Sequence, residues 1–211
     1  MSTDLVRLNR EFYDSFAAEF SRSREAINPG IQSMLGRLDC TSVLDVGCGD
    51  GRVSKALPAD SQYLGLDFSA KLIGRNARGN TAFVLADLVY PLPVAARSFP
   101  AVLCLAVLHH LPDRLSLMRE LARAVKPGGQ VVVSVWQFTH DERMRKKIVQ
   151  DLGHGDYVLD WERGGHGLRF VHEVKEGELK TLANEAGLRV REMFQSDGKS
   201  DDLSLYAILQ S

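Results

Sequence analysis

A glycine-rich turn edged with acidic residues is the feature of this sequence whose residue types point most directly to chemistry. The segment Val43-Leu-Asp-Val-Gly-Cys-Gly-Asp-Gly51 carries a short apolar run, typical of a buried strand, into the expected start of a helix. Glycine lets the backbone approach a ligand closely at such a turn. Asp67 follows about twenty residues later, where its carboxylate can accept hydrogen bonds from a ribose diol. The pattern predicts a nucleotide or nucleoside site, and taken alone it suits NAD.

The charges around the turn distinguish between the candidate ligands. A dinucleotide would place its pyrophosphate at the helix N-terminus, near Asp45 and Asp50, where like charges repel. Arg52 also occupies the position at which the dinucleotide pattern has its third glycine. S-adenosylmethionine carries no phosphate and offers a cationic ammonium and a sulfonium, which acidic side chains attract. We therefore predict S-adenosylmethionine as the cofactor.

Asp87 extends the predicted cofactor site to a third strand end. Its carboxylate can accept a hydrogen bond from the adenine amino group, while the backbone N–H of Leu88 can reach a ring nitrogen. Taken singly, Asp45 could be a buried strand-end carboxylate, and Asp67 and Asp87 could be helix caps. Three acids in this order and phase favour one ligand. The residues predicted to bind the cofactor are Asp45, Gly47, Cys48, Gly49, Gly51, Asp67, Phe68, Asp87, Leu88, Leu105 and His109.

The elements that must hold these residues alternate between apolar runs and amphipathic stretches, as in a parallel β/α sheet. The sequence predicts strands over 42–46, 63–66, 82–85, 101–105, 130–136, 188–194 and 203–209, and helices over 5–20, 28–38, 52–57, 70–76, 113–125 and 176–186. The first two helices form an N-terminal segment, 1–40, and the last two strands an antiparallel hairpin. We expect an α/β fold with a doubly wound, mostly parallel sheet of seven strands in a single domain over 1–211.

Residues 137–170 interrupt this alternation with His, Gly and Trp, over a stretch too long for a bare connection. We interpret the segment as an inserted, partly mobile cap over the working edge of the sheet. It contains a basic run that could contact phosphates, although a solvated helix face is the simpler interpretation. The run consists of Arg143, Arg145, Lys146 and Lys147.

Composition argues against a strongly basic protein, a disulfide-rich protein and a membrane-spanning protein. Lys and Arg number 26 against 27 acidic residues, so no overall positive field favours nucleic acid or an anionic membrane. The 3 cysteines show no disulfide framework or zinc-finger spacing, and we predict no metal site. The apolar run 101–108 is far shorter than the roughly twenty residues of a membrane span, and the N-terminus lacks signal-peptide order. We expect a cytoplasmic protein that does not enter a membrane.

The core motifs resemble those of a known superfamily. The glycine turn, Asp67, Asp87 and the segment Lys126-Pro-Gly-Gly129 are similar to the corresponding motifs of class I S-adenosylmethionine-dependent methyltransferases, over about residues 43–136. The resemblance implies a Rossmann-like fold and a methyltransferase activity. It is specific for the cofactor and says little about the molecule that receives the methyl group.

Two further segments resemble a narrower family, the tRNA wobble-uridine methyltransferases that esterify carboxymethyluridine. They are Phe12-Tyr-Asp-Ser-Phe-Ala-Ala-Glu-Phe-Ser-Arg-Ser-Arg24 and Trp161-Glu-Arg-Gly-Gly-His-Gly-Leu-Arg-Phe-Val-His-Glu-Val-Lys-Glu-Gly-Glu-Leu179. The resemblance implies tRNA as a partner and, as in eukaryotic members, a small zinc-binding activator protein. It also implies an acceptor site made of Arg24, His110, Arg169 and His172.

The chemistry expected at this acceptor site is alignment of an anion. A carboxylate, with a pKa near 4, is already ionised at neutral pH, so it needs charge complementarity more than a general base. Arg24 and Arg169 would hold it, while His110 and His172 orient it. Which of His109 and His110 faces the acceptor stays open. A small metabolite as acceptor and a non-catalytic cofactor-binding subunit stay open as alternatives.

Overall fold

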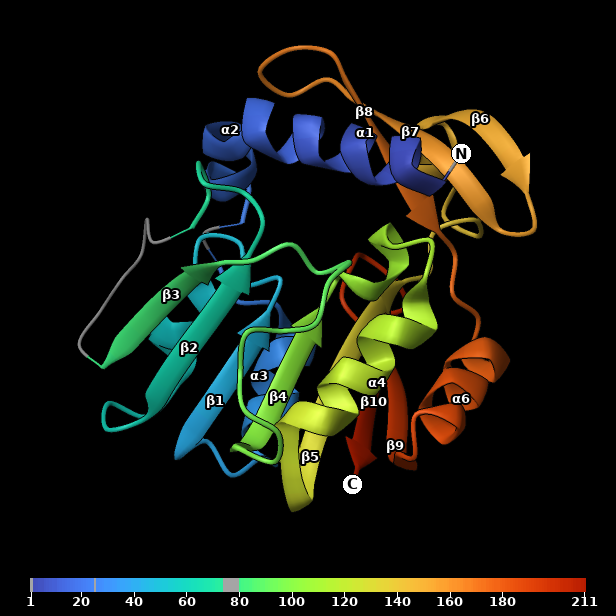
Figure 1. The fold of residues 1–211 in the computed structure, drawn as a ribbon. Coiled ribbons are helices and arrows are strands. Elements are labelled where there is room, and N and C mark those ends of the chain that lie inside the picture. The colour runs from blue at the N-terminus through green and yellow to red at the C-terminus, as the bar shows by residue number, and fades with distance from the viewer. Residues whose placement is uncertain (1, 25, 74–79) are drawn as a thin grey trace.

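The central sheet has seven strands in the order β3-β2-β1-β4-β5-β10-β9 (Figure 1). The structure is a computed structural model that describes residues 2–24, 26–73 and 80–211. Strands β1 to β5 run parallel, and β10 is antiparallel to both β5 and β9. The bounds are β1 Ser42–Val46, β2 Gln62–Asp67, β3 Thr81–Leu85, β4 Phe99–Leu105, β5 Val125–Trp136, β9 Arg189–Ser196 and β10 Ser204–Gln210. This confirms the predicted doubly wound sheet and its terminal hairpin.

Helices cover both faces of this sheet because the central strands are apolar on both sides. On one face, Leu117, Met118 and Leu121 of α4 (Arg114–Ala124) and Leu179 of α6 (Glu176–Glu185) pack into one buried cluster. On the other face, α3 (Pro29–Leu35) belongs to a second cluster. Figure 1 shows α4 and α6 in front of the sheet and α3 behind it. In the described ranges, no helix combines the length and apolar character needed to cross a membrane.

The predicted helices of the first half are shorter or tighter than expected. The helix expected over 5–20 is two helices, α1 (Ser2–Ser15) and α2 (Ala17–Arg22), because the backbone leaves helical geometry at Phe16 (φ −108°, ψ 21°). The helix expected over 52–57 is a short 3-10 helix, η1 (Arg52–Ala56). Of the helix expected over 70–76, residues 70–73 form a turn and the remainder lies outside the described residues.

Strand β5 begins earlier than the sequence predicts. The segment Lys126-Pro-Gly-Gly129 was expected to separate helix from strand, but Val125 already pairs with Phe99 of β4. The register shifts before Gln130 pairs with Ala101, so the extra residues are accommodated as an irregularity within the strand. Asp113 caps α4, with its side chain accepting from the backbone N–H of Ser116.

Residues 137–172 form a second structural layer rather than a loop. They contain α5 (Glu142–Arg145) and a three-stranded antiparallel sheet of β6 (Ile148–Gly153), β7 (Asp156–Trp161) and β8 (Gly167–His172). Strand β8 therefore extends two residues past the expected end of the inserted segment at Phe170. Figure 1 shows α1 and this second sheet together beyond the carboxyl ends of the parallel strands. Ligands bind at this edge in open α/β sheets.

Candidate functional site

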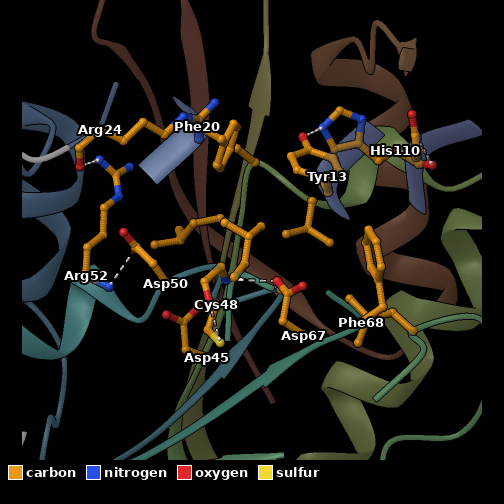
Figure 2. A pocket seen from close by; sticks show the side chains of 18 of the residues that line it. Tyr13, Phe20, Arg24, Asp45, Cys48, Asp50, Arg52, Asp67, Phe68 and His110 are labelled. Carbon is orange, nitrogen blue, oxygen red and sulfur yellow. Dashed lines mark hydrogen bonds between the residues drawn. The ribbon is translucent and has the colours of Figure 1, made fainter. Parts of the chain in front are cut away.

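A pocket lies at the carboxyl ends of β1, β2, β3 and β4, beside the point where the strand order reverses between β1 and β4 (Figure 2). Helices α1 and α2 contribute its other wall. The predicted site residues that line it are Arg24, Asp45, Gly47, Cys48, Gly49, Asp67, Phe68, Asp87, Leu88, Leu105 and His110. The ends of four strands and the N-terminal helices therefore line one pocket.

Three glycines of the turn adopt the left-handed backbone conformation that favours glycine. Gly47 has φ +76°, and a Cβ added there would lie 2.2 Å from Val107 Cγ2. Gly49 has φ +57° with nothing within 4 Å of an added Cβ, so its backbone is open toward the pocket. Gly51 also requires positive φ, at +78°, but it packs against Phe83 and does not line the pocket.

Carboxylates form the floor of the pocket. Asp67 accepts from the backbone N–H of Gly49 at 2.8 Å and from that of Ser69 at 2.9 Å, which ties the turn after β1 to the end of β2 (Figure 2). Asp45 is 1% exposed and accepts from the Tyr63 hydroxyl at 2.7 Å. Burial raises the pKa of Asp45 to about 6 and raises that of Asp67 above its ordinary value. The floor is therefore acidic and hydrogen-bonded into place.

The opposite end of the pocket centres on His110. Its Nδ1 lies 2.8 Å from the Phe170 carbonyl oxygen. Its Nε2 lies 2.7 Å from the Tyr13 hydroxyl (Figure 2). A carbonyl can only accept, so Nδ1 carries the proton and Nε2 accepts from Tyr13. Burial, assisted by the positive charge of Arg169, lowers the pKa of His110 to about 3. His110 is consequently a neutral imidazole at physiological pH.

Two arginines lie near His110 among aromatic rings. The Arg24 guanidinium carbon is 4.2 Å from the centre of the Phe20 ring and 5.7 Å from that of Trp136. Arg169 is 2% exposed, and its guanidinium carbon is 4.6 Å from the centre of the same Trp136 ring. Among the described residues, Arg169 Nε and Nη1 have no hydrogen-bond partner. Burial lowers the pKa of both arginines, that of Arg24 to about 10.

The negative charge of the pocket floor distinguishes between the candidate cofactors. Asp45, Asp50 and Asp67 surround the open backbone of Gly49, where a phosphate group would meet negative charge on several sides. A ligand with an ammonium and a sulfonium meets opposite charge there instead. Asp87 and Leu88 line the pocket at the end of β3, within the same cavity. The residues fit S-adenosylmethionine and do not fit a pyrophosphate.

Comparison with known proteins agrees with this geometry. The family described as "Methyltransferase domain" matches residues 44–133. A ubiquinone biosynthesis O-methyltransferase of Bordetella avium (strain 197N) is 33% identical over 175 residues, which cover 77% of this chain and 70% of that protein. The chain belongs to the class I S-adenosylmethionine-dependent methyltransferases. Its cofactor is S-adenosylmethionine.

Further similar proteins include a tRNA methyltransferase and two solved structures with the same fold. The tRNA (carboxymethyluridine(34)-5-O)-methyltransferase of Arabidopsis thaliana is 38% identical over 153 residues, covering 71% of this chain but 37% of the plant protein. The solved complex between the Haloferax volcanii Trm112 methyltransferase activator and a methyltransferase has the same fold, with a TM-score of 0.71, 18% identity, and coverage of 95% of this chain and 96% of that chain. Magnesium protoporphyrin IX methyltransferase from Synechocystis, solved with bound SAH, has a TM-score of 0.67 and 18% identity. The match covers 96% of this chain and 97% of that chain.

Three predicted site residues of the methyltransferase besides Gly51 lie outside the pocket lining: His109, Arg169 and His172. His109 is fully buried and accepts from the Trp136 backbone N–H at 3.3 Å, so of the histidine pair His110 is the one that faces the pocket. His172 uses both ring nitrogens elsewhere. Nδ1 lies 2.6 Å from Asp156 and Nε2 lies 2.8 Å from Glu178, so the ring links the second sheet to α6.

The sequence analysis assigned no role to several polar residues that line the pocket of the methyltransferase, namely Asn9, Arg10, Tyr13 and Ser21. Asn9 is 3% exposed and donates to the carbonyl oxygens of His110 and Phe170, while it accepts from the Phe170 N–H at 2.7 Å. Asn9 and Tyr13 are four residues apart, in phase with the apolar residues of α1. Their polar groups on the buried face of α1 could have indicated a functional role, because a buried polar group needs a specific hydrogen-bond partner.

Proposed function

We propose that this enzyme methylates a carboxylate, and that the carboxylate belongs to a modified wobble uridine in tRNA. The observation that carries the proposal is the pair Arg24 and Arg169. In the part of the chain that the structure describes, neither forms an ion pair with a carboxylate, although Arg169 is almost fully buried. An enclosed cation without a counter-charge is costly unless a ligand supplies one.

The cofactor, when bound, supplies an activated methyl group on its sulfonium. Asp67 would accept from the ribose hydroxyls, Asp87 and the Leu88 backbone would contact the adenine, and Asp45 and Asp50 would face the ammonium end. Phe68 lines the same pocket and offers an aromatic ring to the nucleoside. These roles leave the end of the pocket around Arg24, Tyr13 and His110 for the methyl acceptor.

Among the described residues at this end of the pocket, His110 is the candidate base, and its state favours an acceptor that is already ionised. His110 is neutral, but its Nε2 lone pair is engaged by Tyr13, and its pKa of about 3 makes it a weak base. A carboxylate with a pKa near 4 needs no deprotonation at neutral pH, whereas a phenol with a pKa near 10 does. Arg24 and Arg169 provide planar donors that suit a carboxylate. This argues against a phenol or another acceptor whose hydroxyl must first lose its proton.

The tRNA part of the proposal is supported by the name of the Arabidopsis relative and by a basic surface on the inserted segment. Arg143, Lys146, Lys147 and Arg163 line one groove beside α5, together with Glu142, Asp160 and Glu162. Burial, assisted by the positive charges of neighbouring arginines, lowers the pKa of Lys147. Lys146 is paired with Glu142 at 2.9 Å, but the four cations of the groove outnumber its three carboxylates, and a phosphate backbone would meet this excess of positive charge.

We also infer a small activator protein as a partner, on the strength of the edge strand β3. Among the described strands, β3 pairs only with β2, so its other edge is available for an added strand. Exposed apolar side chains gather on and after it: Val84, Leu85, Val89 and Tyr90. The related fold in the Haloferax complex is bound to an activator, which makes a protein of that kind the proposed occupant.

Methyl transfer from labelled S-adenosylmethionine to tRNA bearing carboxymethyluridine tests the proposal, with the enzyme alone and with a candidate activator. We expect label in a single nucleoside ester that mild alkali releases, since esters hydrolyse where ring-methylated bases do not. The double variant Arg24→Ala/Arg169→Ala should lose this activity, while Arg119→Ala, an exposed change on α4, should keep it. Labelling of a phenolic metabolite in preference to tRNA would contradict the proposal.

A further inference from the structure

The hydroxyl of Tyr13 is the point at which the acceptor end of the pocket is organised. We propose that Tyr13 is a positioning residue for the methyl acceptor, acting through His110, Arg24 and Arg169. This inference rests on the proposed carboxylate acceptor, and it concerns a residue of α1 that the sequence motifs did not single out. Tyr13 lines the pocket, is 8% exposed and lies across from the carboxylate floor.

The direction of the hydrogen bonds around Tyr13 follows from the chemistry of its partners. The Phe170 carbonyl fixes the proton on His110 Nδ1, so His110 Nε2 must accept and the Tyr13 hydroxyl must donate. With its proton committed to His110, the Tyr13 oxygen keeps only lone pairs for its other neighbours. His110 thus orients the Tyr13 oxygen and does not itself offer a nitrogen to the acceptor.

The two arginines lie against the rings that pack on Tyr13. The Arg24 guanidinium carbon is 4.2 Å from the centre of the Phe20 ring, and that of Arg169 is 5.3 Å from the centre of the Phe12 ring. Both of these rings contact Tyr13 edge-to-face, so Tyr13 lies between the two cations. A bound carboxylate would sit between these cations, at a place set by the Tyr13 oxygen.

Packing holds the Tyr13 ring in one orientation. Edge-to-face contacts join it to Phe12 and Phe20, each with ring centres 5.0 Å apart, and to Phe68 at 5.9 Å. Asn9, one turn earlier on α1, binds the backbone of both His110 and Phe170. The ring is therefore fixed relative to His110, and Phe68 connects it to the cofactor end of the pocket. A rigid support of this kind is what an aligned transfer needs.

The variant Tyr13→Phe tests the proposal, because it removes the hydroxyl and keeps the ring and its packing. Loss of a hydrogen-bonding group that orders charged side chains should lower kcat/KM for the tRNA acceptor about tenfold to a hundredfold. The dissociation constant of S-adenosylmethionine, measured by calorimetry, should stay within about twofold, since the cofactor floor is untouched. Tyr157→Phe, which removes a hydroxyl from the second sheet, should leave both values unchanged.

A structural signature separates positioning from a loss of stability. The ¹⁵N NMR signal of His110 Nε2 should shift in Tyr13→Phe, because this nitrogen loses its hydrogen-bond donor. An unchanged kcat/KM or an unchanged Nε2 signal would overturn the role of Tyr13. If the wild-type enzyme methylates no tRNA, the proposed acceptor is wrong, and the Tyr13 proposal is then decided by the NMR comparison alone.

Discussion

Arg10 of α1 and Asp87, in the loop after β3, form an ion pair, and both side chains line the cofactor pocket. Asp87 is the carboxylate expected to recognise the adenine amino group. In this structure its partner is instead a residue of the N-terminal helix. Two more contacts, Ser21 with Asp50 and Asp14 with Ser69, join α1 and α2 to the cofactor loops. We therefore expect cofactor binding to affect the position of these helices.

Arg10→Ala should tighten cofactor binding by up to about fivefold. The side chains of Arg10 and Asp87 are 45% and 25% exposed, so their pair is worth roughly 0–1 kcal/mol that the adenine must compete with. Isothermal calorimetry with S-adenosylmethionine measures the change. Arg7→Ala, an exposed change on the same helix, serves as the control. Weaker binding by Arg10→Ala would show that Arg10 supports the cofactor and does not compete with it.

Gly47→Ala should destabilise the protein by about 3 kcal/mol and abolish measurable cofactor binding. The substitution strains a backbone at φ +76° and places a Cβ against Val107. Gly128→Ala provides the matched comparison, because φ is +75° there but nothing lies within 4 Å. That variant should lose only about 1 kcal/mol. Urea unfolding of both proteins tests the difference, and equal losses would mean that the contact with Val107 relaxes at no cost.

His110 should make the free energy of unfolding depend on pH below neutrality. Its pKa in the folded protein is about 3, below the value near 6.5 of an unfolded chain, so only the unfolded chain binds a proton between these values. Its contribution to stability is complete above about pH 6.5 and declines by about 1.4 kcal/mol per unit as the pH falls toward 3. The variant His110→Gln should flatten this decline.

The pH dependence of the free energy of unfolding has to be compared between the wild type and a variant that differs only at His110, because other groups also change it. Asp45 acts in the opposite direction, because its pKa is raised to about 6 and its stabilising effect is lost as the pH rises through that value. A wild-type slope retained in His110→Gln would place the proton uptake at another group.

Arg169→Met should separate stability from activity. Removing a buried cation whose Nε and Nη1 lack partners, and filling its space with an apolar chain, should raise the free energy of unfolding by about 1 kcal/mol. Methyl transfer to a carboxylate should fall at least about a hundredfold, because a charged hydrogen-bond partner of the acceptor is gone. Thermal unfolding and kcat/KM measure the two effects. A large loss of stability would instead show that the contacts with Phe12, Trp136 and Trp161 outweigh the cost of burial.

The sequence by itself determined the sheet and the cofactor end of the pocket. Runs such as 42–46 and 101–105 are apolar enough to be buried on both faces, and the carboxyl ends of parallel strands must share one edge. Gly47, Asp67 and Asp87 lie at or just after the ends of such strands, and they line one pocket. The hydrogen bond from the Gly49 N–H to Asp67 joins residues 18 apart, so it forms only once β1 and β2 are paired.

Only the tertiary structure decided the acceptor end of the pocket. Tyr13 meets His110 across 97 positions of sequence, and Asn9 meets Phe170 across 161, so no periodicity within α1 reveals their partners. His172 was expected beside the acceptor, but Asp156 and Glu178 take both of its nitrogens once β7 and α6 are in place. Local spacing determines which face of an element a residue occupies, whereas the packing of distant elements determines which atoms it meets.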